Sequence, residues 1–169
     1  QFGDIDGVGA VVYGVAFLLN GPLTDRWGGR VTLILAAGGS ALSNLVMAWA
    51  VAGRDTHPER LYQVFMVTNA VNMYFQSFGA VSIVKVNAPW FHVRERGVLG
   101  GLFGILISLG LYFAYDWARL LAEAWGLTAS FVVPAGVLLL CVVMAFALIR
   151  DVPSQAGFED FDTGDASSG

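Results

Sequence analysis

The charged residues most able to do chemistry lie in one short turn between two long apolar runs. The segment from Gly21 to Arg30 holds one acid, Asp25, together with two arginines and three glycines: Arg26, Arg30, Gly21, Gly28 and Gly29. Glycine permits a tight reversal of the chain, and a carboxylate among guanidinium groups can form ion pairs that break and form again. This pattern indicates a charge network that opens and closes.

Three amide side chains form a second group. Asn69, Asn72 and Gln76 are spaced three and four residues apart, so they share one face of a helix. Amides facing lipid are costly, so this face should meet other helices or a water-filled cavity. Interhelical hydrogen bonding and lining of a solute path both remain open. Lys85, on the same stretch, either snorkels to the membrane interface or attracts anions at the mouth of a cavity.

The composition indicates a membrane protein. Only 13% of the 169 residues are charged and 56% are hydrophobic, with a mean hydropathy of +0.65, whereas soluble domains carry about 25% charged residues. The net charge of −4 reflects acids near the end of the chain, Glu159, Asp160, Asp162 and Asp165. We therefore expect a lipid bilayer as the surrounding medium and no nucleic-acid partner.

Apolar stretches of membrane-spanning length recur five times. Crossing about 30 Å of hydrocarbon takes roughly 20 helical residues, and the predicted spans are 7–24, 31–53, 61–86, 97–121 and 127–149. The fold class is therefore an all-α membrane protein, with a helix bundle over 1–149. From 150 to 169 the composition predicts the start of a flexible acidic linker.

Basic residues in the connections predict the orientation. Cytoplasmic loops are enriched in Lys and Arg, and the larger set falls on one side: Arg26, Arg30, Lys85, Arg94, Arg96 and Arg150. The smaller set is Arg54, Arg60 and Arg119. We expect the first side to be cytoplasmic. Because the sequence starts at Gln1 and ends in Gly and Ser, we also expect it to belong to a longer chain.

Enzyme chemistry is not expected. No nucleophile and base, paired carboxylates or metal-ligand cluster lies within a span. Cys141 sits in an apolar run, and His57 and His92 are single loop residues, so we expect neither a metal nor a cofactor. Asp116 and Arg119 are three residues apart and should form a local ion pair.

The turn described first resembles the loop signature of the major facilitator superfamily. Its defining types recur here at the same spacings, at Gly21, Leu23, Asp25, Arg26, Gly28 and Arg30. The resemblance implies a transporter of the major facilitator fold, with these residues at a cytoplasmic gate.

A second resemblance is to the organophosphate:phosphate antiporter branch, the glycerol-phosphate and hexose-phosphate transporters. It rests on Phe75-Gln76, on Trp90 followed by Arg94-Glu95-Arg96-Gly97, and on Arg150-Asp151-Val152-Pro153. In that register the five spans are helices two to six of twelve, a partial amino-terminal bundle whose partners are the remaining helices of the same transporter. The resemblance adds Arg94, Glu95 and Arg96 to the gate.

The resemblance implies secondary active transport of a small organic anion across the cell membrane, a sugar phosphate or glycerol phosphate exchanged for inorganic phosphate. Asn69, Asn72, Gln76 and Lys85 would then belong to the substrate cavity. Phe17, where some members carry lysine, and the altered pairs Phe103-Gly104 and Ile107-Ser108 favour a facilitator of a neutral or other solute. A transporter-like receptor for a sugar phosphate is the third reading.

Overall fold

The computed structural model describes residues 2–53 and 58–164. In these residues it contains long helices and no strand, which agrees with the predicted all-α class. The five long helices are α1 (Phe2–Trp27), α2 (Gly29–Ala52), α3 (Pro58–Asn87), α4 (Arg96–Trp125) and α5 (Ala129–Leu148). Two short 3-10 helices, η1 (Ala88–Trp90) and η2 (Pro153–Ala156), follow α3 and α5.

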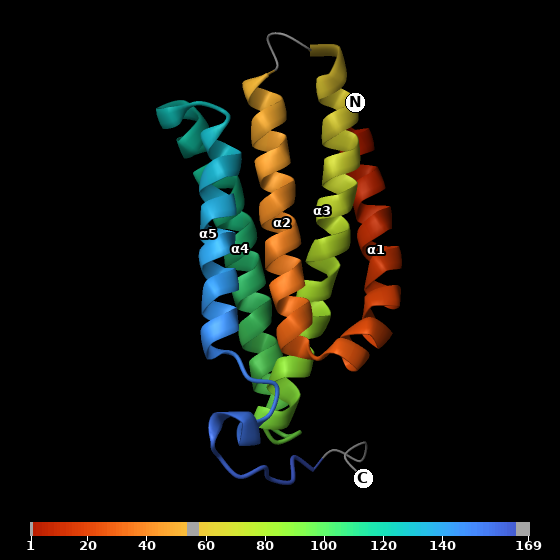
Figure 1. The fold of residues 1–169 in the computed structure, drawn as a ribbon, viewed down its shortest axis with the longest axis vertical. Coiled ribbons are helices and arrows are strands. Elements are labelled where there is room, and N and C mark those ends of the chain that lie inside the picture. The colour runs from red at the N-terminus through yellow and green to blue at the C-terminus, as the bar shows by residue number, and fades with distance from the viewer. Residues whose placement is uncertain (1, 54–57, 165–169) are drawn as a thin grey trace.

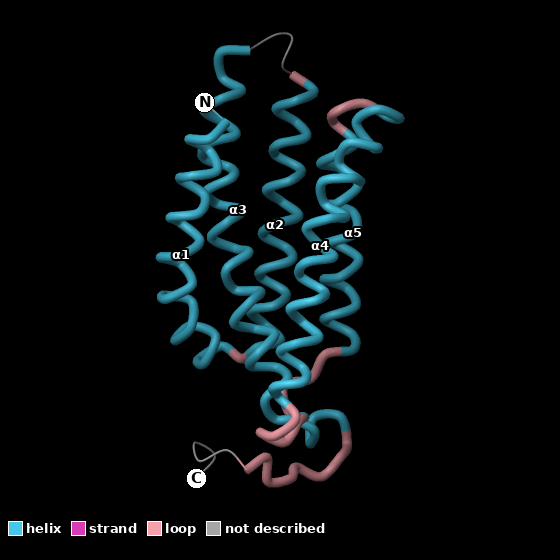
Figure 2. Tube along the Cα trace, turned by 180° about the vertical axis from the view of Figure 1, so that it is seen from behind, coloured by secondary structure: helices cyan, strands magenta, loops and turns pink. Residues whose placement is uncertain are grey.

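The five long helices run alternately up and down, roughly side by side (Figure 1). The helix α3 makes broad contacts with both α1 and α2, while α1 and α2 barely touch each other. On its other side α2 packs against α5, and α4 makes only a narrow contact with α5. Figure 2 shows from behind that α4 and α5 form a pair apart from α1.

Four of the described helices, α1, α2, α4 and α5, are long and apolar enough to cross a membrane. The helix α3 is 30 residues long, but its amide and hydroxyl side chains make it less apolar than the other four. The sequence predicted a span here as well, over 61–86, and this span stays a prediction.

Several helices run past the predicted spans. Charged residues such as Asp4 and Arg26 are helical although they lie outside the apolar stretch 7–24. An acid in the first turn and a base in the last turn interact favourably with the helix dipole and stabilise the helix, so α1 continues through these two positions. The last turns of α1, which include Pro22, bend toward α2 (Figure 1).

A single residue, Gly28, connects α1 to α2. Its φ angle is +88°, a conformation that side chains with a Cβ rarely adopt. The next residue, Gly29, lies against α3, because a Cβ there would stand 2.9 Å from the backbone nitrogen of Val86. Gly28 thus allows the tight turn between α1 and α2, and Gly29 allows α2 to pack closely against α3.

Residues 149–164 fold back under the end of the bundle that carries Gly28, which we call the motif end (Figure 1). The indole Nε1 of Trp90 donates to the Arg150 carbonyl oxygen at 3.1 Å, and the Val93 backbone N–H donates to the Thr163 carbonyl oxygen at 2.9 Å. The sequence predicted a flexible linker here. Over 150–164 the structure instead has a hydrogen-bonded segment, because backbone groups and one aromatic side chain make contacts that composition does not reveal.

Candidate functional site

An ion pair joins two helices at the motif end. The Lys85 Nζ atom near the end of α3 lies 2.7 Å from Asp25 Oδ1 near the end of α1. The two side chains are 45% and 69% exposed, respectively. Sequence reasoning had placed Asp25 in a gate and Lys85 in a cavity. The structure brings the two together at the bundle end.

The start of α2 is capped by a residue from the far end of the chain. Gly28 has no side chain to cap the helix, and the Arg30 backbone N–H donates instead to Asp151 Oδ1 at 2.8 Å. A Cβ on Gly28 would lie 2.9 Å from Asp151 Oδ2, so the glycine also makes room for the carboxylate. A negative charge at a helix N-terminus is favourable because the free N–H groups and the helix dipole point there.

The Arg30 side chain holds α5 rather than Asp25. Its Nη2 donates to the Phe146 carbonyl oxygen, and its guanidinium carbon lies 5.2 Å from the Phe146 ring centroid. Backbone and side chain of Arg30 therefore bind the end of α5 and the residues after it. The loop motif is tied to α3 through Asp25 and to α5 through Arg30.

The second group of predicted gate residues makes contacts within its own connection. The Glu95 Oε2 atom accepts from the His92 backbone N–H at 3.0 Å, and Arg96 Nη2 donates to the Ala88 carbonyl oxygen at 2.9 Å. The Arg94 backbone N–H donates to His92 Nδ1 at 3.2 Å, and its side chain is exposed. Among the described contacts, none joins these three residues directly to the Gly21–Arg30 turn.

The amide face of α3 divides into two parts. Asn69 Nδ2 donates to the Ile5 carbonyl oxygen of α1 at 3.2 Å, which is an interhelical hydrogen bond. Asn72 is 8% exposed, and its Oδ1 atom is buried without a hydrogen-bond partner. Gln76 is exposed. Asn69 thus joins α3 to α1 by a hydrogen bond, whereas Asn72 and Gln76 have polar atoms that could bind a solute.

Gln76 lines a shallow hollow of 360 Å³ between α2, α3 and α5. Its other polar lining residues are Ser40 and Asn44 on α2. Ser40 is 4% exposed, and its hydroxyl oxygen has no partner. The sequence analysis missed this pair. Their spacing of four residues on one helix face was the signal that could have found them.

Buried hydroxyl and amide contacts hold α3 in place. Asn20 Nδ2 of α1 donates to Ser77 Oγ at 2.7 Å, and Ser82 Oγ donates to Thr32 Oγ1 of α2 at 2.8 Å. All four residues are 0% exposed. Such contacts between helices are typical of proteins whose outer surface faces lipid.

The predicted local pair on α4 is wrong. Arg119 pairs with Glu123, with Nη1 and Oε1 3.9 Å apart, rather than with Asp116. The spacing of four residues competes with the spacing of three on a helix, and both side chains of the observed pair are more than half exposed. Among the described residues, no group of three His, Cys, Asp or Glu could hold a metal ion.

A bundle of long apolar helices joined by buried polar contacts, with large apolar side chains over its outside, is a multi-pass helical membrane protein. The Major Facilitator Superfamily matches residues 1–166, and the chain belongs to this family. The family and the relatives described next are transporters, not enzymes.

Three relatives show the range of similarity. "Putative glycerol-3-phosphate transporter 1" of Arabidopsis thaliana is 28% identical over 98% of this chain and 31% of its own length. "Probable nitrate/nitrite transporter" of Mycobacterium tuberculosis is 30% identical over 80% of this chain and 32% of its own length. "Monocarboxylate transporter 6" of Mus musculus is 30% identical over 88% of this chain and 29% of its own length.

The chain spans about a third of the length of these relatives. No solved structure is significantly similar to it.

Proposed function

We propose that the chain forms part of a secondary active transporter of small organic anions in the cell membrane. In its most specific form, a sugar phosphate or glycerol phosphate is exchanged for inorganic phosphate by alternating access. Relatives named for glycerol 3-phosphate, nitrate or nitrite, and monocarboxylates support this proposal, because each name refers to a small anion. The alternative of a facilitator for a neutral or other solute rests on Phe17 and the altered α4 pairs; the names for nitrate or nitrite and monocarboxylates refer to solutes other than organic phosphates.

The observation that carries the mechanism is the Lys85–Asp25 ion pair of 2.7 Å. Alternating access requires contacts at one end of the bundle that hold the closed state and then break. An exposed ion pair is worth roughly 0–1 kcal/mol, so thermal motion suffices to open it. The pair joins the ends of α1 and α3 at the motif end, and both of its side chains are exposed there.

In this proposal Lys85 belongs to the gate, because Asp25 holds its ammonium group. Arg26 and Arg94 have exposed side chains at the motif end and would form ion pairs when the gate moves. Arg30 and Arg96 anchor the two connections through backbone carbonyls. Glu95 orders its own turn.

The cavity is proposed to contain Gln76, Ser40 and Asn44, which line the hollow, together with Asn72, which lies one turn before Gln76 on α3. These are uncharged donors and acceptors, suited to hydroxyl and phosphoryl oxygens of a sugar phosphate. Charges that neutralise the anion would come from outside these residues, since no charged side chain lines this hollow.

Phosphate exchange tests the substrate class. The full-length protein is reconstituted in liposomes that are loaded in turn with glycerol phosphate, a hexose phosphate or phosphoglycerate, and uptake of labelled inorganic phosphate from outside is measured. Exchange with one of them supports the antiporter and names its substrate. No exchange from folded protein removes the phosphate assignment, and binding of a sugar phosphate without transport would favour a receptor.

The gate is tested by Asp25→Asn. Turnover should fall several-fold with little change in substrate affinity, because the substitution weakens a closed-state contact and leaves the cavity intact. The exchanged pair Asp25→Lys with Lys85→Asp should recover part of the rate. Wild-type turnover in both single variants, Asp25→Asn and Lys85→Gln, would show that the pair has no gating role.

The cavity is tested by Asn72→Leu and Gln76→Leu, measured as substrate affinity and transport rate. We expect affinity to weaken about tenfold in the double variant, since a lost hydrogen bond costs about 0.5–1.5 kcal/mol. Gln63→Leu, also on α3 and exposed, is the matched control. Equal affinity in the double variant and the control would refute the assignment of this face to the cavity.

A further inference from the structure

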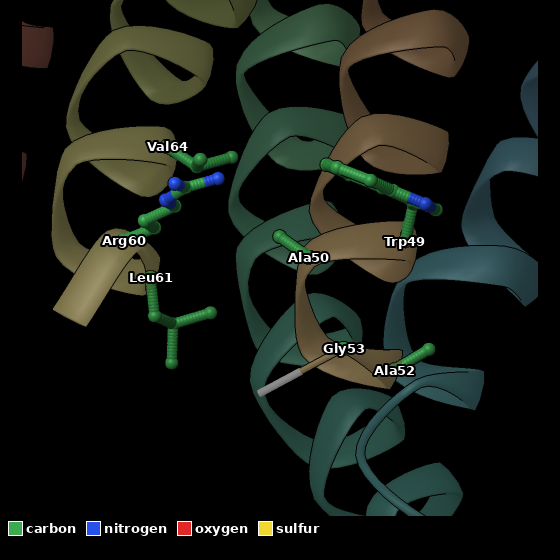
Figure 3. A pocket seen from close by; sticks show the side chains of 7 residues that line it. All are labelled: Trp49, Ala50, Ala52, Gly53, Arg60, Leu61 and Val64. Carbon is green, nitrogen blue, oxygen red and sulfur yellow. The ribbon is translucent and has the colours of Figure 1, made fainter. Parts of the chain in front are cut away.

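A separate hollow lies at the opposite end of the bundle from the motif turn. It has a volume of 320 Å³, within the range of small-molecule sites of about 300–1,000 Å³. The last turn of α2 and the first turns of α3 form it, through Trp49, Ala50, Ala52, Gly53, Arg60, Leu61 and Val64 (Figure 3). The helix α2 has 24 residues and is about 36 Å long, and the hollow and the motif end lie at its two opposite ends.

The lining is apolar apart from one cation. Among the described residues that line the hollow, Arg60 is the only charged one, and it forms no ion pair with another described residue. Its guanidinium extends from α3 toward α2 (Figure 3). Trp49 of α2 is 74% exposed and lies on the outside of the bundle.

The position of the hollow fits the boundary between hydrocarbon and headgroups. It lies where the membrane-spanning helix α2 ends, and Trp and Arg are the residues that settle at this depth with an apolar body and a polar tip. A matching ligand has an apolar part that covers Leu61 and Val64 and an anionic part that reaches Arg60.

We propose that this hollow binds an anionic phospholipid. The phosphodiester lies on the guanidinium of Arg60, which matches phosphate oxygens with two parallel N–H donors. The glycerol and the first acyl carbons lie against Trp49, Leu61 and Val64. Free phosphate is a poorer match, because it would leave most of its oxygens facing apolar side chains without donors.

The experiment uses Trp49 as the reporter. The full-length protein in mixed micelles is titrated with brominated phosphatidylglycerol or brominated phosphatidylcholine, and the quenching of Trp49 is obtained by subtracting the signal of Trp49→Phe. We expect half-quenching at about fivefold lower mole fraction of phosphatidylglycerol, the factor set by one arginine beside an anionic headgroup. Equal mole fractions for the two lipids would overturn the proposal, and this arm needs no substitution at Arg60.

Substitution then locates the preference. Arg60→Gln should abolish the fivefold difference. Arg119→Gln, at the same end of the bundle and 67% exposed in its pair with Glu123, should retain it. A difference that persists in Arg60→Gln would overturn the assignment to Arg60. Displacement of phosphatidylglycerol by an equal concentration of inorganic phosphate would identify a soluble-anion site and overturn the lipid assignment.

Discussion

The helices α3 and α4 have the same length of 30 residues, yet α3 has broad contacts with two neighbouring helices, whereas α4 has only a narrow contact with α5. The helix α3 packs on α1 and α2 through buried Asn, Ser and Thr contacts. The helix α4 has no buried residue among those described. The more polar helix is therefore the inner one.

This arrangement reverses the rule for soluble proteins and follows from the solvent. In water, apolar side chains gain by burial. In lipid, apolar side chains lose nothing on the outside, while an unpaired amide or hydroxyl group is costly there. The polar side chains of α3 are therefore more stable in contact with other helices than in lipid. The apolar side chains of α4 gain no comparable stabilisation from burial within this chain. Variants on the two helices should differ accordingly.

The largest effect is expected at Gly39 of α2, which lies against α3. A Cβ there would stand 2.1 Å from the Phe75 ring. Gly39→Ala should lower the free energy of unfolding by about 1–3 kcal/mol, because the ring and the α2 backbone must separate. Thermal unfolding in detergent measures it. The control is Gly101→Ala on α4, where nothing lies within 4 Å. Equal losses in the two variants would contradict the comparison.

A smaller effect is expected at Asp151, which fastens the start of α2 from outside the helix. Asp151→Ala should cost about 1 kcal/mol, the usual loss for a capping side chain, and Asp151→Asn should cost less because an acceptor oxygen remains. The diagnostic measurement is amide hydrogen exchange at Arg30, whose N–H is the donor. Unchanged protection of that amide in Asp151→Ala would show that the contact is dispensable.

The smallest effect is expected on α4. Glu123→Gln removes the 3.9 Å pair with Arg119, in which both side chains are more than half exposed. Such pairs contribute a few tenths of a kcal/mol, about 0.3–0.5 at most. The melting temperature should therefore stay within measurement error. A loss as large as that of Asp151→Ala would mean that the exposed helix is held by its charges.

Much of the fold was predictable from the sequence because a membrane imposes one length scale. Apolar runs long enough to cross it predicted α1, α2, α4 and α5, and the Gly-Asp-Arg spacing between the first two predicted the family. The helix ends were less predictable, because Asp4 and Arg26 continue α1 beyond its apolar part.

The site was less predictable, because its contacts join residues far apart in the chain. Asp151 lies 121 positions from Arg30, and Lys85 lies 60 positions from Asp25. Local spacing cannot reveal such pairs. Helical periodicity did place Asn69, Asn72 and Gln76 on one face, but it could not tell that Asn69 contacts α1 while Gln76 lines a hollow.

The single-residue connection at Gly28 acts as a mechanical coupling. A long loop can change shape when one of the helices it joins moves, but a hydrogen-bonded turn of one residue cannot. The Gly28 N–H donates to the Thr24 carbonyl oxygen at 2.9 Å, and the Gly28 carbonyl oxygen accepts from Thr32. The ends of α1, α2 and α5 are therefore joined without an intervening flexible loop, through Gly28 and through the hydrogen bond from Arg30 to Asp151. If the Lys85–Asp25 pair opens as proposed, the three helix ends should move together.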